Sequence, residues 1–344
     1  MKTDHSFLCT VLVLNYNGLS FLQQFCTGWI QHLPANAELV IADNASTDDS
    51  LAYLRSEHPD IRIIALDKNH GFAKGYNLAM AEIETPYTIL LNSDIEIKSP
   101  WIDPLLEMLQ SDDTIAAVQP KIMDQKQPSH FEYAGAAGGF VDALYYPFCR
   151  GRIFQELEED QNQYEQATEI FWASGSAFAV RTDLFNAHGG FDSDFFAHME
   201  EIDLCWRLQN LGFKIMYQPQ SKVYHVGGGT LSYASSRKTF LNFRNSLLMI
   251  FKNEEKSKVF GVIFKRMILD GFAGLSFLSK GQVGSFAAVF RAHIAFYGLM
   301  SKFRVKRKAL ANSIISQADV KGRFNKSIVY QHYIKGLKRF TALK

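Results

Sequence analysis

The sequence predicts an α/β fold in which a mostly parallel sheet is flanked by helices and followed by a basic helical region. Strand-like and helix-like patterns alternate through the first half of the chain, which is typical of βαβ units. The apolar run at 89–91 leads directly into Asn92, Ser93 and Asp94, as expected where a buried strand ends at the edge of a sheet. A length of 344 residues suits one large domain or two smaller ones.

Short apolar runs mark the predicted strands, and helical patterns separate them. The first run, Phe7–Leu14, is similar to the apolar part of a signal peptide, but Asp4 precedes it and no small-residue cleavage site follows, so we interpret it as a strand. Ser99 and Pro100 predict the N-cap and the first position of a helix. The strands are expected at 8–14, 38–42, 61–66, 87–91 and 115–119, and the helices near 19–32, 48–57, 72–83 and 100–110.

The alternation stops between residues 124 and 165. The Gly- and Ala-rich run at 135–139 and the polar run at 156–166 predict long, mobile loops, which would act as a lid or acceptor loop or simply cover the surface. Regular structure is expected to resume as a strand at 174–181, a helix near 198–211 and strands at 213–217 and 221–225.

The net charge of +1 hides a strong asymmetry along the chain. Residues 1–236 carry 14 Lys and Arg against 31 Asp and Glu, whereas residues 237–344 carry 22 against 4. We therefore divide the chain into a domain at 1–236 and a basic helical region at 237–344. The basic region predicts an anionic partner such as a lipid surface or nucleic acid; alternatively, it docks on the acidic domain.

Apolar and basic residues are mixed at helical spacing in this region. Its longest stretches without formal charge beyond residue 260 are 10 residues, at 281–290 and 292–301, whereas a spanning helix needs roughly 20 apolar residues. We therefore expect no membrane span but amphipathic helices that lie in the surface of an anionic membrane. The alternative is a helical subdomain that packs on itself.

The cysteines indicate the compartment. Cys9, Cys26, Cys149 and Cys205 have no ligand spacing, and the first and last of them lie in apolar or helical patterns, so reduced core residues are expected. Reduced cysteines suit the cytosol. Together with the basic region, they predict a cytoplasmic protein that is peripheral on the inner face of the cell membrane.

Two polar clusters lie in the first third of the chain. Asp43 ends a predicted strand, where a carboxylate can accept the imide N–H of a uracil or thymine ring; alternatively, Ser46 and Thr47 cap a turn. Further on, Gly71 opens a predicted helix whose N–H groups, together with Lys74, would favour a diphosphate.

Asp94 and His225 are the candidate cation ligands. Asp94 is placed to hold a divalent cation against nucleotide phosphates, although Asn, Ser and Asp are also ordinary turn residues. His225 precedes the glycines at 227–229 and is either a structural histidine or a second ligand.

Three carboxylates, Glu200, Glu201 and Asp203, stand at the start of a predicted helix, where they suit the helix dipole. Neighbouring carboxylates also raise one another's pKa, as a general base at neutral pH requires. The sequence alone leaves both interpretations open.

Taken in order, these motifs resemble family 2 glycosyltransferases, and more closely their rhamnosyltransferase-like bacterial branch. The resemblance spans about residues 8–230 and implies the GT-A fold, a nucleotide-sugar donor and inversion at the anomeric carbon. The segments that carry it are 12–18, 43–48, 69–77, 90–94, 189–192, 200–207 and 225–229.

The resemblance also implies roles for single residues. Asp43 matches the base-reading aspartate of the family, and Asp94 matches the metal-binding last residue of its DxD-type motif. Glu201 stands where the family usually has its catalytic Asp, so either Glu201 or Glu200 is the implied base. Because an asparagine replaces the first acidic residue of the strict DxD motif, a Mg²⁺ or Mn²⁺ cofactor would be held mainly by Asp94 and His225.

The remaining site residues are predicted in two groups. Asp203 and Gly190 are expected to support the acceptor side. The QxxRW signature of processive synthases is absent before Trp206 and Arg207, so single addition is expected. The predicted donor-binding residues are Asn15, Tyr16, Asn17, Asp43, Asn44, Gly71, Lys74, Asn77, Asn92 and Ser93.

The sequence therefore predicts an inverting, non-processive, metal-dependent hexosyltransferase. It would move a sugar from a UDP- or dTDP-linked donor to a hydroxyl of a glycan or lipid-linked acceptor in bacterial cell-surface polysaccharide synthesis. A nucleotidyltransferase would usually carry a Gly-rich basic loop where this chain has Asn15-Tyr16-Asn17-Gly18. A non-catalytic membrane scaffold is the second alternative. A nucleic-acid-binding module would not explain the acidic strand tips, so no nucleic-acid partner is expected.

Overall fold

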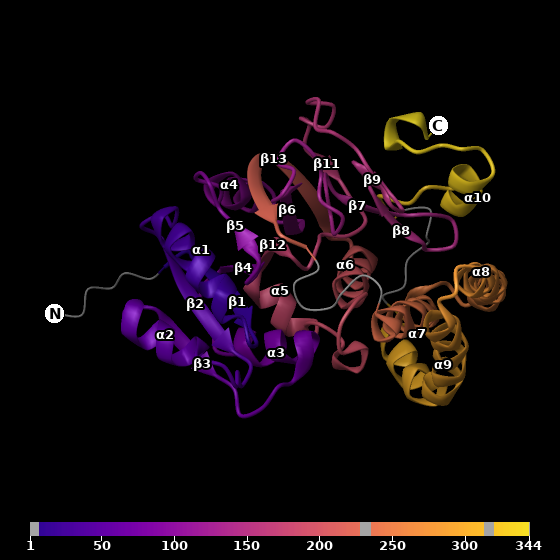
Figure 1. Ribbon diagram of the computed structural model, residues 1–344, viewed down its shortest axis with the longest axis horizontal. Coiled ribbons are helices and arrows are strands. Elements are labelled where there is room, and N and C mark those ends of the chain that lie inside the picture. Colours follow the sequence, from indigo (N-terminus) through magenta and orange to yellow (C-terminus); the bar gives the residue numbers. More distant parts are fainter. Residues whose placement is uncertain (1–6, 228–234, 313–319, 344) are drawn as a thin grey trace.

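The computed structural model describes residues 7–227, 235–312 and 320–343. Its centre is a mixed, mostly parallel sheet with helices on both faces (Figure 1), which confirms the predicted fold class. The strands of this sheet are β1 Cys9–Asn15, β2 Ala37–Asp43, β3 Arg62–Ala65, β4 Tyr87–Asn92, β5 Ile95–Glu96, β6 Ile115–Asp124, β11 Thr168–Glu169, β12 Ala177–Arg181 and β13 Lys214–His225.

The order of the strands is β11-β13-β6-β12-β4-β1-β2-β3, with β5 paired to β13. Pairing is parallel from β4 through β1 and β2 to β3, and again between β6 and β13, whereas β12 joins these two groups in antiparallel fashion. The helices of the first part are α1 Leu19–Gln31, α2 Ser50–Glu57, α3 Gly71–Met80, α4 Asp103–Ser111, α5 Thr182–Ala187 and α6 Glu200–Asn210.

The two faces of the sheet bury separate cores, because successive strand residues point to opposite faces. In β1, Val11 and Val13 belong to the core shared with α1 and α4, whereas Leu12 belongs to the core shared with α3 and α6. Because both faces of these strands are buried, successive residues are apolar, and the apolar runs therefore mark the strands. All four cysteines are free and buried, as expected for reduced core residues.

Two local predictions are wrong. The helix expected from Ser99 and Pro100 begins only at Asp103, because Trp101 is buried in the core and its carbonyl oxygen accepts a hydrogen bond of 2.6 Å from Ser221 Oγ. The two strands expected at 213–217 and 221–225 are one strand, β13, with an irregular register between 218 and 222.

The segment 124–165 contains a second sheet rather than only long loops. Four short strands in the order β10-β9-β8-β7 form it: β7 Gly139–Val141, β8 Pro147–Cys149, β9 Arg152–Ile153 and β10 Glu156–Leu157. Ala136, Ala137 and Tyr145 are fully buried, so this part of the segment belongs to the core. The Gly- and Ala-rich run at 135–139 therefore marks close packing and not a free loop, because a Cβ on Gly139 would overlap the ring of Trp172.

The basic region forms a helical bundle and then returns to the small sheet. The helices are α7 Ser236–Asn253, α8 Val259–Ser279, α9 Val283–Leu310 and α10 Ile328–Tyr333. Leu247 and Phe303 share a core with the first part, and Phe324 N–H donates to Val141 O at 2.8 Å. Figure 1 shows α10 beside β8 and β9, where Ile328 packs with Phe148 and Ile153. One hydrophobic core thus includes residues from both sides of residue 236, and the division of the chain there stays a prediction.

One helix of the described ranges, α9, is long and apolar enough to cross a membrane, by length and composition alone. The expectation that no segment here reaches that length is therefore wrong, because an apolar window can include the single charge of Arg291. Within the fold, α9 packs against α7, and 28% of that window is buried inside the protein.

Candidate active site

The predicted strand ends meet at one edge of the sheet. Asn15 at the end of β1 is in register with Asp43 on β2, and Leu14 is in register with Asn92 on β4. The carboxyl ends of parallel strands are where ligands bind in open α/β sheets. The structure thus brings together side chains that are up to 77 positions apart in the chain.

The start of α6 and the end of β13 lie beside this edge. The N–H of Asn92 donates to Ser176 O at 2.9 Å, and a Cβ built on the adjacent Gly175 would lie 3.8 Å from the Cβ of Glu201. The N–H of Val226 donates to Asp94 O at 3.0 Å, which places the end of β13 against the segment after β4. The motifs at the start of α6 and at the end of β13 therefore lie beside those at the ends of β1, β2 and β4.

Asp43 organises a turn at the end of β2. Its side chain is fully buried, and Oδ1 accepts hydrogen bonds from Asn15 Nδ2 at 3.0 Å and from Ser46 Oγ at 2.6 Å. Oδ2 accepts the N–H of Ser46 at 2.9 Å. The turn interpretation is confirmed, but Ser46 and Thr47 do not cap α2, which begins only at Ser50. Reading of a nucleotide base by Asp43 stays a prediction.

Two neighbours of this turn are exposed. Tyr16 is 39% exposed, and the exposed Asn17 is tied to the turn because its Oδ1 accepts the N–H of Thr47 at 2.7 Å. Asn17 has a φ of 51°, a left-handed conformation that asparagine tolerates better than most residues. The site of the predicted donor contacts is therefore a rigid rim with one exposed aromatic ring.

The helix start at Gly71 differs from the expectation. Its N–H donates to Asn69 Oδ1 at 2.8 Å, and the N–H groups of Phe72 and Ala73 donate to Phe196 O at 3.1 and 3.3 Å. Because protein oxygens already accept from these amides, they are not open to a diphosphate. Gly71 is required for another reason: a Cβ there would lie 2.7 Å from the ring of Phe196.

The other predicted donor residues of this segment mostly hold the backbone. Asn44 Nδ2 donates to Gly71 O at 3.1 Å. Asn77 Nδ2 donates to Phe191 O at 2.7 Å, and Asn77 Oδ1 accepts the N–H of Phe191 at 2.9 Å. Lys74 is exposed. Donor binding by these residues stays a prediction, and their observed contacts are structural.

Asp94 and His225 are spaced like two ligands of one ion. Each is 6% exposed, and Asp94 Oδ1 lies 3.2 Å from His225 Nε2. Two ligands at right angles, each about 2.1 Å from a cation, stand about 3.0 Å apart, so the pair fits neighbouring positions around a small divalent ion. On the other side of the ring, Glu132 Oε1 lies 3.1 Å from His225 Nδ1, as carboxylates do that orient a metal-binding histidine.

The electrostatics of this trio favour positive charge. Burial opposes protonation of His225, but Glu132 and Asp94 outweigh it and hold the pKa of His225 well above its usual range. Burial raises the pKa of Asp94, but the facing His225 lowers it by more, so the pKa lies below its usual range. The described residues contain no group of three or more acidic, His or Cys side chains arranged to hold a metal by themselves.

Glu200 and Glu201 open α6 with unpaired carboxylate oxygens. Glu200 is 3% exposed and Glu201 is half-buried. Within the described ranges, Oε2 of each is shielded and has no hydrogen-bond partner. Burial raises the pKa of Glu201 to about 7, and burial together with the charge of Glu201 raises the pKa of Glu200 well above its usual range. A carboxylate that titrates near neutral pH is suited to general-base chemistry.

The loop before these carboxylates is strained and is held from α7. Phe196, His198 and Met199 have φ values of 67°, 70° and 74°, in the left-handed region that non-glycine residues rarely adopt. Asn245 Nδ2 donates to the carbonyl oxygens of Phe195, Ala197 and His198 at 3.0, 2.9 and 2.8 Å. One side chain of the basic region therefore fixes the loop that positions Glu200 and Glu201.

Asp203 ties the same helix to α7. It is fully buried and accepts hydrogen bonds from Arg207 Nε at 2.9 Å, Lys252 Nζ at 2.8 Å and Asn253 Nδ2 at 2.8 Å. Arg207 also donates to the carbonyl oxygen of Gly190 at 2.5 Å. The two residues predicted to support the acceptor side thus belong to one network inside the fold.

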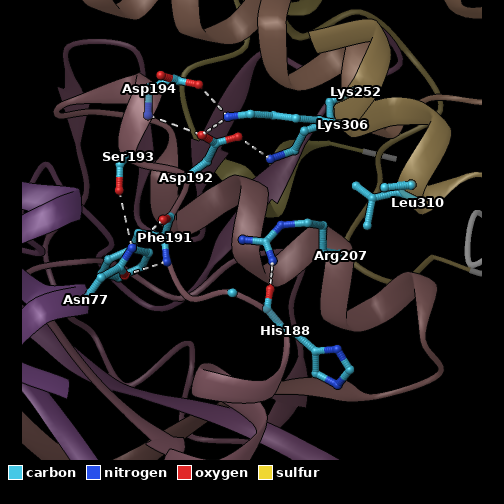
Figure 2. A pocket seen from close by; sticks show the side chains of 12 residues that line it. Asn77, His188, Phe191, Asp192, Ser193, Asp194, Arg207, Lys252, Lys306 and Leu310 are labelled. Atoms are coloured by element: carbon cyan, nitrogen blue, oxygen red, sulfur yellow. Dashed lines mark hydrogen bonds and ion pairs between the residues drawn. The ribbon is translucent and has the colours of Figure 1, made fainter. Parts of the chain in front are cut away.

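A cavity of about 430 Å³ lies next to this network, and Figure 2 shows its lining. Lys252 and Lys306 both contact Asp192, and Lys306 also contacts Asp194 at 2.6 Å. Its cations are thus paired with the carboxylates of the lining, so the cavity offers little net charge to a ligand. The ion pairs around the cavity connect the segment after α5 to α7 and α9.

Sequence reasoning missed Glu132, Asn245 and Lys252. Glu132 lies in the segment predicted as loops, and no motif marks it. Asn245 and Lys252 interrupt an apolar helical pattern on α7 at buried positions, where their exposed fractions are 0% and 3%. A polar residue on an otherwise apolar helix face was the available signal, because buried polar side chains need specific partners.

Comparison with known proteins gives a family and a fold. The chain matches the family described as Glycosyl transferase family 2 over residues 10–189. It is 24% identical over 229 residues to the N-acetylglucosaminyl-diphospho-decaprenol L-rhamnosyltransferase of Mycobacterium tuberculosis, covering 62% of this chain and 75% of that protein. It is 22% identical over 247 residues to the low-salt glycan biosynthesis hexosyltransferase Agl10 of Haloferax volcanii, covering 70% and 74%.

Solved structures share the architecture. GalNAc-T7 with UDP, GalNAc and Mn²⁺ superposes with a TM-score of 0.59 at 18% identity, over 74% of this chain and 49% of that one. S. aureus TarS 1-349 in complex with UDP superposes with a TM-score of 0.51 at 14% identity, over 96% and 92%. At these identities the likeness establishes the GT-A-like fold alone.

Proposed function

Because the chain belongs to glycosyl transferase family 2, we propose that it adds a single sugar from a UDP- or dTDP-linked donor to an acceptor hydroxyl, with inversion at the anomeric carbon. The observation that carries this proposal is the half-buried Glu201, whose Oε2 lacks a partner among the described residues beside the edge where β1, β2 and β4 end. A free carboxylate at that edge supplies the one group that the reaction requires from the protein, a base.

In the proposed reaction, the acceptor oxygen forms a bond to C1 of the sugar as the bond from C1 to the donor diphosphate breaks. A carboxylate oxygen of Glu201 takes the hydroxyl proton, and the nucleoside diphosphate leaves with the electron pair of the broken bond. Attack from the face opposite the leaving group inverts the configuration. Glu201 suits this role better than Glu200, because it is less buried and its pKa lies at about 7.

Asp94 and His225 are the residues that would hold Mg²⁺ or Mn²⁺. The cation would supply positive charge against the diphosphate as it leaves. Two protein ligands are enough where substrate phosphates complete the coordination, which is common for Mg²⁺. The Glu132 carboxylate, 3.1 Å from His225 Nδ1, would help to keep Nε2 directed at a bound cation.

The proposal is tested by measuring nucleotide release from UDP-, dTDP- and GDP-sugars by the full chain, with and without Mn²⁺. We expect release from a UDP- or dTDP-sugar, dependent on the metal, and loss of metal-dependent nucleotide binding in Asp94→Ala by calorimetric titration. Glu96→Gln, two residues further along the chain, is the matched control. Release from GDP-sugars alone, or binding unchanged by Asp94→Ala, would contradict the donor or metal assignment.

We also propose that the acceptor is a glycan or lipid-linked sugar of cell-surface polysaccharide synthesis and that the protein is peripheral on the cytoplasmic face of a membrane. The bundle helices carry large apolar side chains that are more than half exposed, among them Phe264 at 67%, Phe272 at 64% and Phe290 at 65%. The net positive charge of 237–344 complements anionic lipid, where each Lys or Arg near the surface contributes about 1 kcal/mol.

Co-sedimentation with phosphatidylglycerol vesicles tests this second part. The double variant F264S/F290S should lose most of the binding, because it removes apolar area that would enter the lipid interface. The control Y333S/I334S removes two similarly exposed side chains, at 66% and 70%, near the C-terminal end of the chain and should bind like the wild type. Equal binding of all three proteins would exclude α8 and α9 as the lipid-facing surface.

A further inference from the structure

A second cavity, of about 530 Å³, lies between α7, α9 and the loop that precedes α6. Three arginines line it: Arg237 and Arg244 of α7 and Arg291 of α9. Aromatic rings hold their guanidinium groups. The Arg237 Cζ lies 5.0 Å from the ring centroid of Phe196, and those of Arg244 and Arg291 lie 5.3 and 5.7 Å from that of Phe240.

The arginines of this cavity form no ion pair within the described part of the protein. No carboxylate lines the cavity, and neither Arg237 nor Arg291 is within ion-pair distance of a described acidic residue. Arg244 donates to the carbonyl oxygens of Asp194 and Phe195, both at 3.1 Å; the charge of Asp194 attracts it, but no described carboxylate lies within ion-pair distance. The cavity in Figure 2 differs in this respect, because its lysines contact Asp192 and Asp194.

The helix geometry adds to this excess of positive charge. Arg237 lies in the first turn of α7, where the helix dipole is positive and where no acidic residue is present. Cations at this end of a helix are unfavourable unless an anion lies nearby, and the free N–H groups of a helix start are themselves suited to an anion. The cavity therefore combines three guanidinium groups with the anion-binding end of a long helix.

The position of the cavity relates it to both parts of the proposed function. Phe196, which forms one wall, lies four residues before Glu200, and its carbonyl oxygen accepts from the start of α3. Arg291, which also lines the cavity, follows Phe290, one of the apolar side chains exposed on α9. The cavity thus adjoins both the loop before α6 and the helix that we propose faces lipid.

We infer that this cavity binds the diphosphate of a lipid-diphosphate-linked acceptor, with its apolar chain along α9 and its sugar toward Glu201. The inference rests on the proposed function and makes it more specific, because it names the class of acceptor. Arginine suits the role, since its planar fork forms paired hydrogen bonds with phosphate oxygens. The same chemistry would accept the donor diphosphate or a phospholipid headgroup, and the test separates these sources.

The test measures affinity of the full chain for farnesyl diphosphate, for UDP with Mn²⁺ and for phosphatidylglycerol vesicles. In R237Q/R291Q we expect the dissociation constant for farnesyl diphosphate to rise about tenfold or more, because two charge-assisted contacts are lost. UDP affinity should stay within about twofold of the wild type, because we place the donor at the edge of the sheet and not in this cavity. The control K265Q/K280Q removes two exposed charges, one on α8 and one at its C-cap, and should leave farnesyl diphosphate affinity unchanged.

The outcomes are distinct. If R237Q/R291Q weakens UDP instead, the cavity belongs to the donor, and if it weakens only vesicle binding, it holds a headgroup; either result overturns the inference. R237K/R291K keeps the charge and should retain most of the farnesyl diphosphate affinity, which separates loss of contacts from misfolding. Absence of both UDP and dTDP binding in the wild type would defeat the proposed function, whereas specific loss of farnesyl diphosphate binding would still support the cavity.

Discussion

Two acidic clusters lie at the same edge of the sheet, and they are built differently. Both oxygens of Asp43 accept hydrogen bonds from Asn15 and Ser46. Glu200 and Glu201 each keep a shielded oxygen without a partner in the described ranges. Buried polar atoms are normally paired, so the exceptions mark places where stability is given up. The hydrogen bonds of Asp43 therefore stabilise the fold, whereas the pair on α6 is available for chemistry.

The largest expected effect is on turnover. Glu201→Gln should lower kcat by about 10²–10⁴-fold, because the amide cannot take the proton of the acceptor hydroxyl. Donor affinity should be retained, which calorimetric titration of nucleotide would show. Glu200→Gln keeps the shape of the neighbouring side chain and should cost much less. If Glu200→Gln is the more damaging of the two, the base is Glu200.

The next effect concerns the loop that carries the pair. Asn245→Ala removes a donor from the carbonyl oxygens of Ala197 and His198 in the strained segment 195–198, whereas Phe195 O keeps Arg244 as a donor. We expect a loss of about 2–4 kcal/mol in the free energy of unfolding, together with a lower kcat, since each unpaired buried group costs about 1–3 kcal/mol. Chemical denaturation measures the first quantity.

Thr239→Ala is the control for this variant. It lies on the same helix and loses only a 3.4 Å contact with the carbonyl oxygen of Ser235. Its stability and kcat should stay close to those of the wild type. Equal stability of the Asn245 and Thr239 variants would show that α7 does not position the loop.

The sequence predicts the parts of the site that follow from strand periodicity. Asp94 and His225 meet because each follows or ends a strand of the same sheet, and strand ends can be recognised from apolar runs. Glu132 and Asn245 could not be found in this way, because they reach the site from irregular or helical segments whose tertiary position no local pattern encodes. The small sheet at 139–157 was missed for the same reason: its strands are two or three residues long and its glycines imitate a loop.

Substitutions at Asp43 and at Glu201 should change the free energy of unfolding in opposite directions. Asp43→Asn replaces an acceptor by a donor and should lower the free energy of unfolding by about 1–3 kcal/mol. Glu201→Gln should raise it at pH 8. Because burial raises the folded-state pKa of Glu201 from 4.5 to about 7, the unfolded chain loses this proton first as pH rises. The stability of the fold therefore falls as pH rises from 4.5 to about 7 and is lower by a constant amount above that range.

Denaturation of both variants at pH 5 and pH 8 measures this difference. The gain from Glu201→Gln should be larger at pH 8, where the carboxylate it replaces is ionised, and small at pH 5. The loss from Asp43→Asn should be present at both. A destabilised Glu201→Gln protein at pH 8 would mean that this carboxylate is paired in solution and that the contrast between the clusters is wrong.

The smallest expected effect is the pH dependence of turnover in the unmodified chain. A base must be ionised before it can take a proton, so kcat should rise with pH through about 7 and then level off. One pH unit below the midpoint, kcat should be about tenfold lower than its plateau. Glu201→Asp shortens the side chain by one methylene and should move this midpoint, whereas Glu200→Gln should leave it near 7, because burial and not the charge of Glu200 raises the pKa of Glu201. A profile that is flat from pH 5.5 to 8.5 at saturating substrates would mean that the step limited by Glu201 does not limit turnover, and the raised pKa would then have no catalytic use.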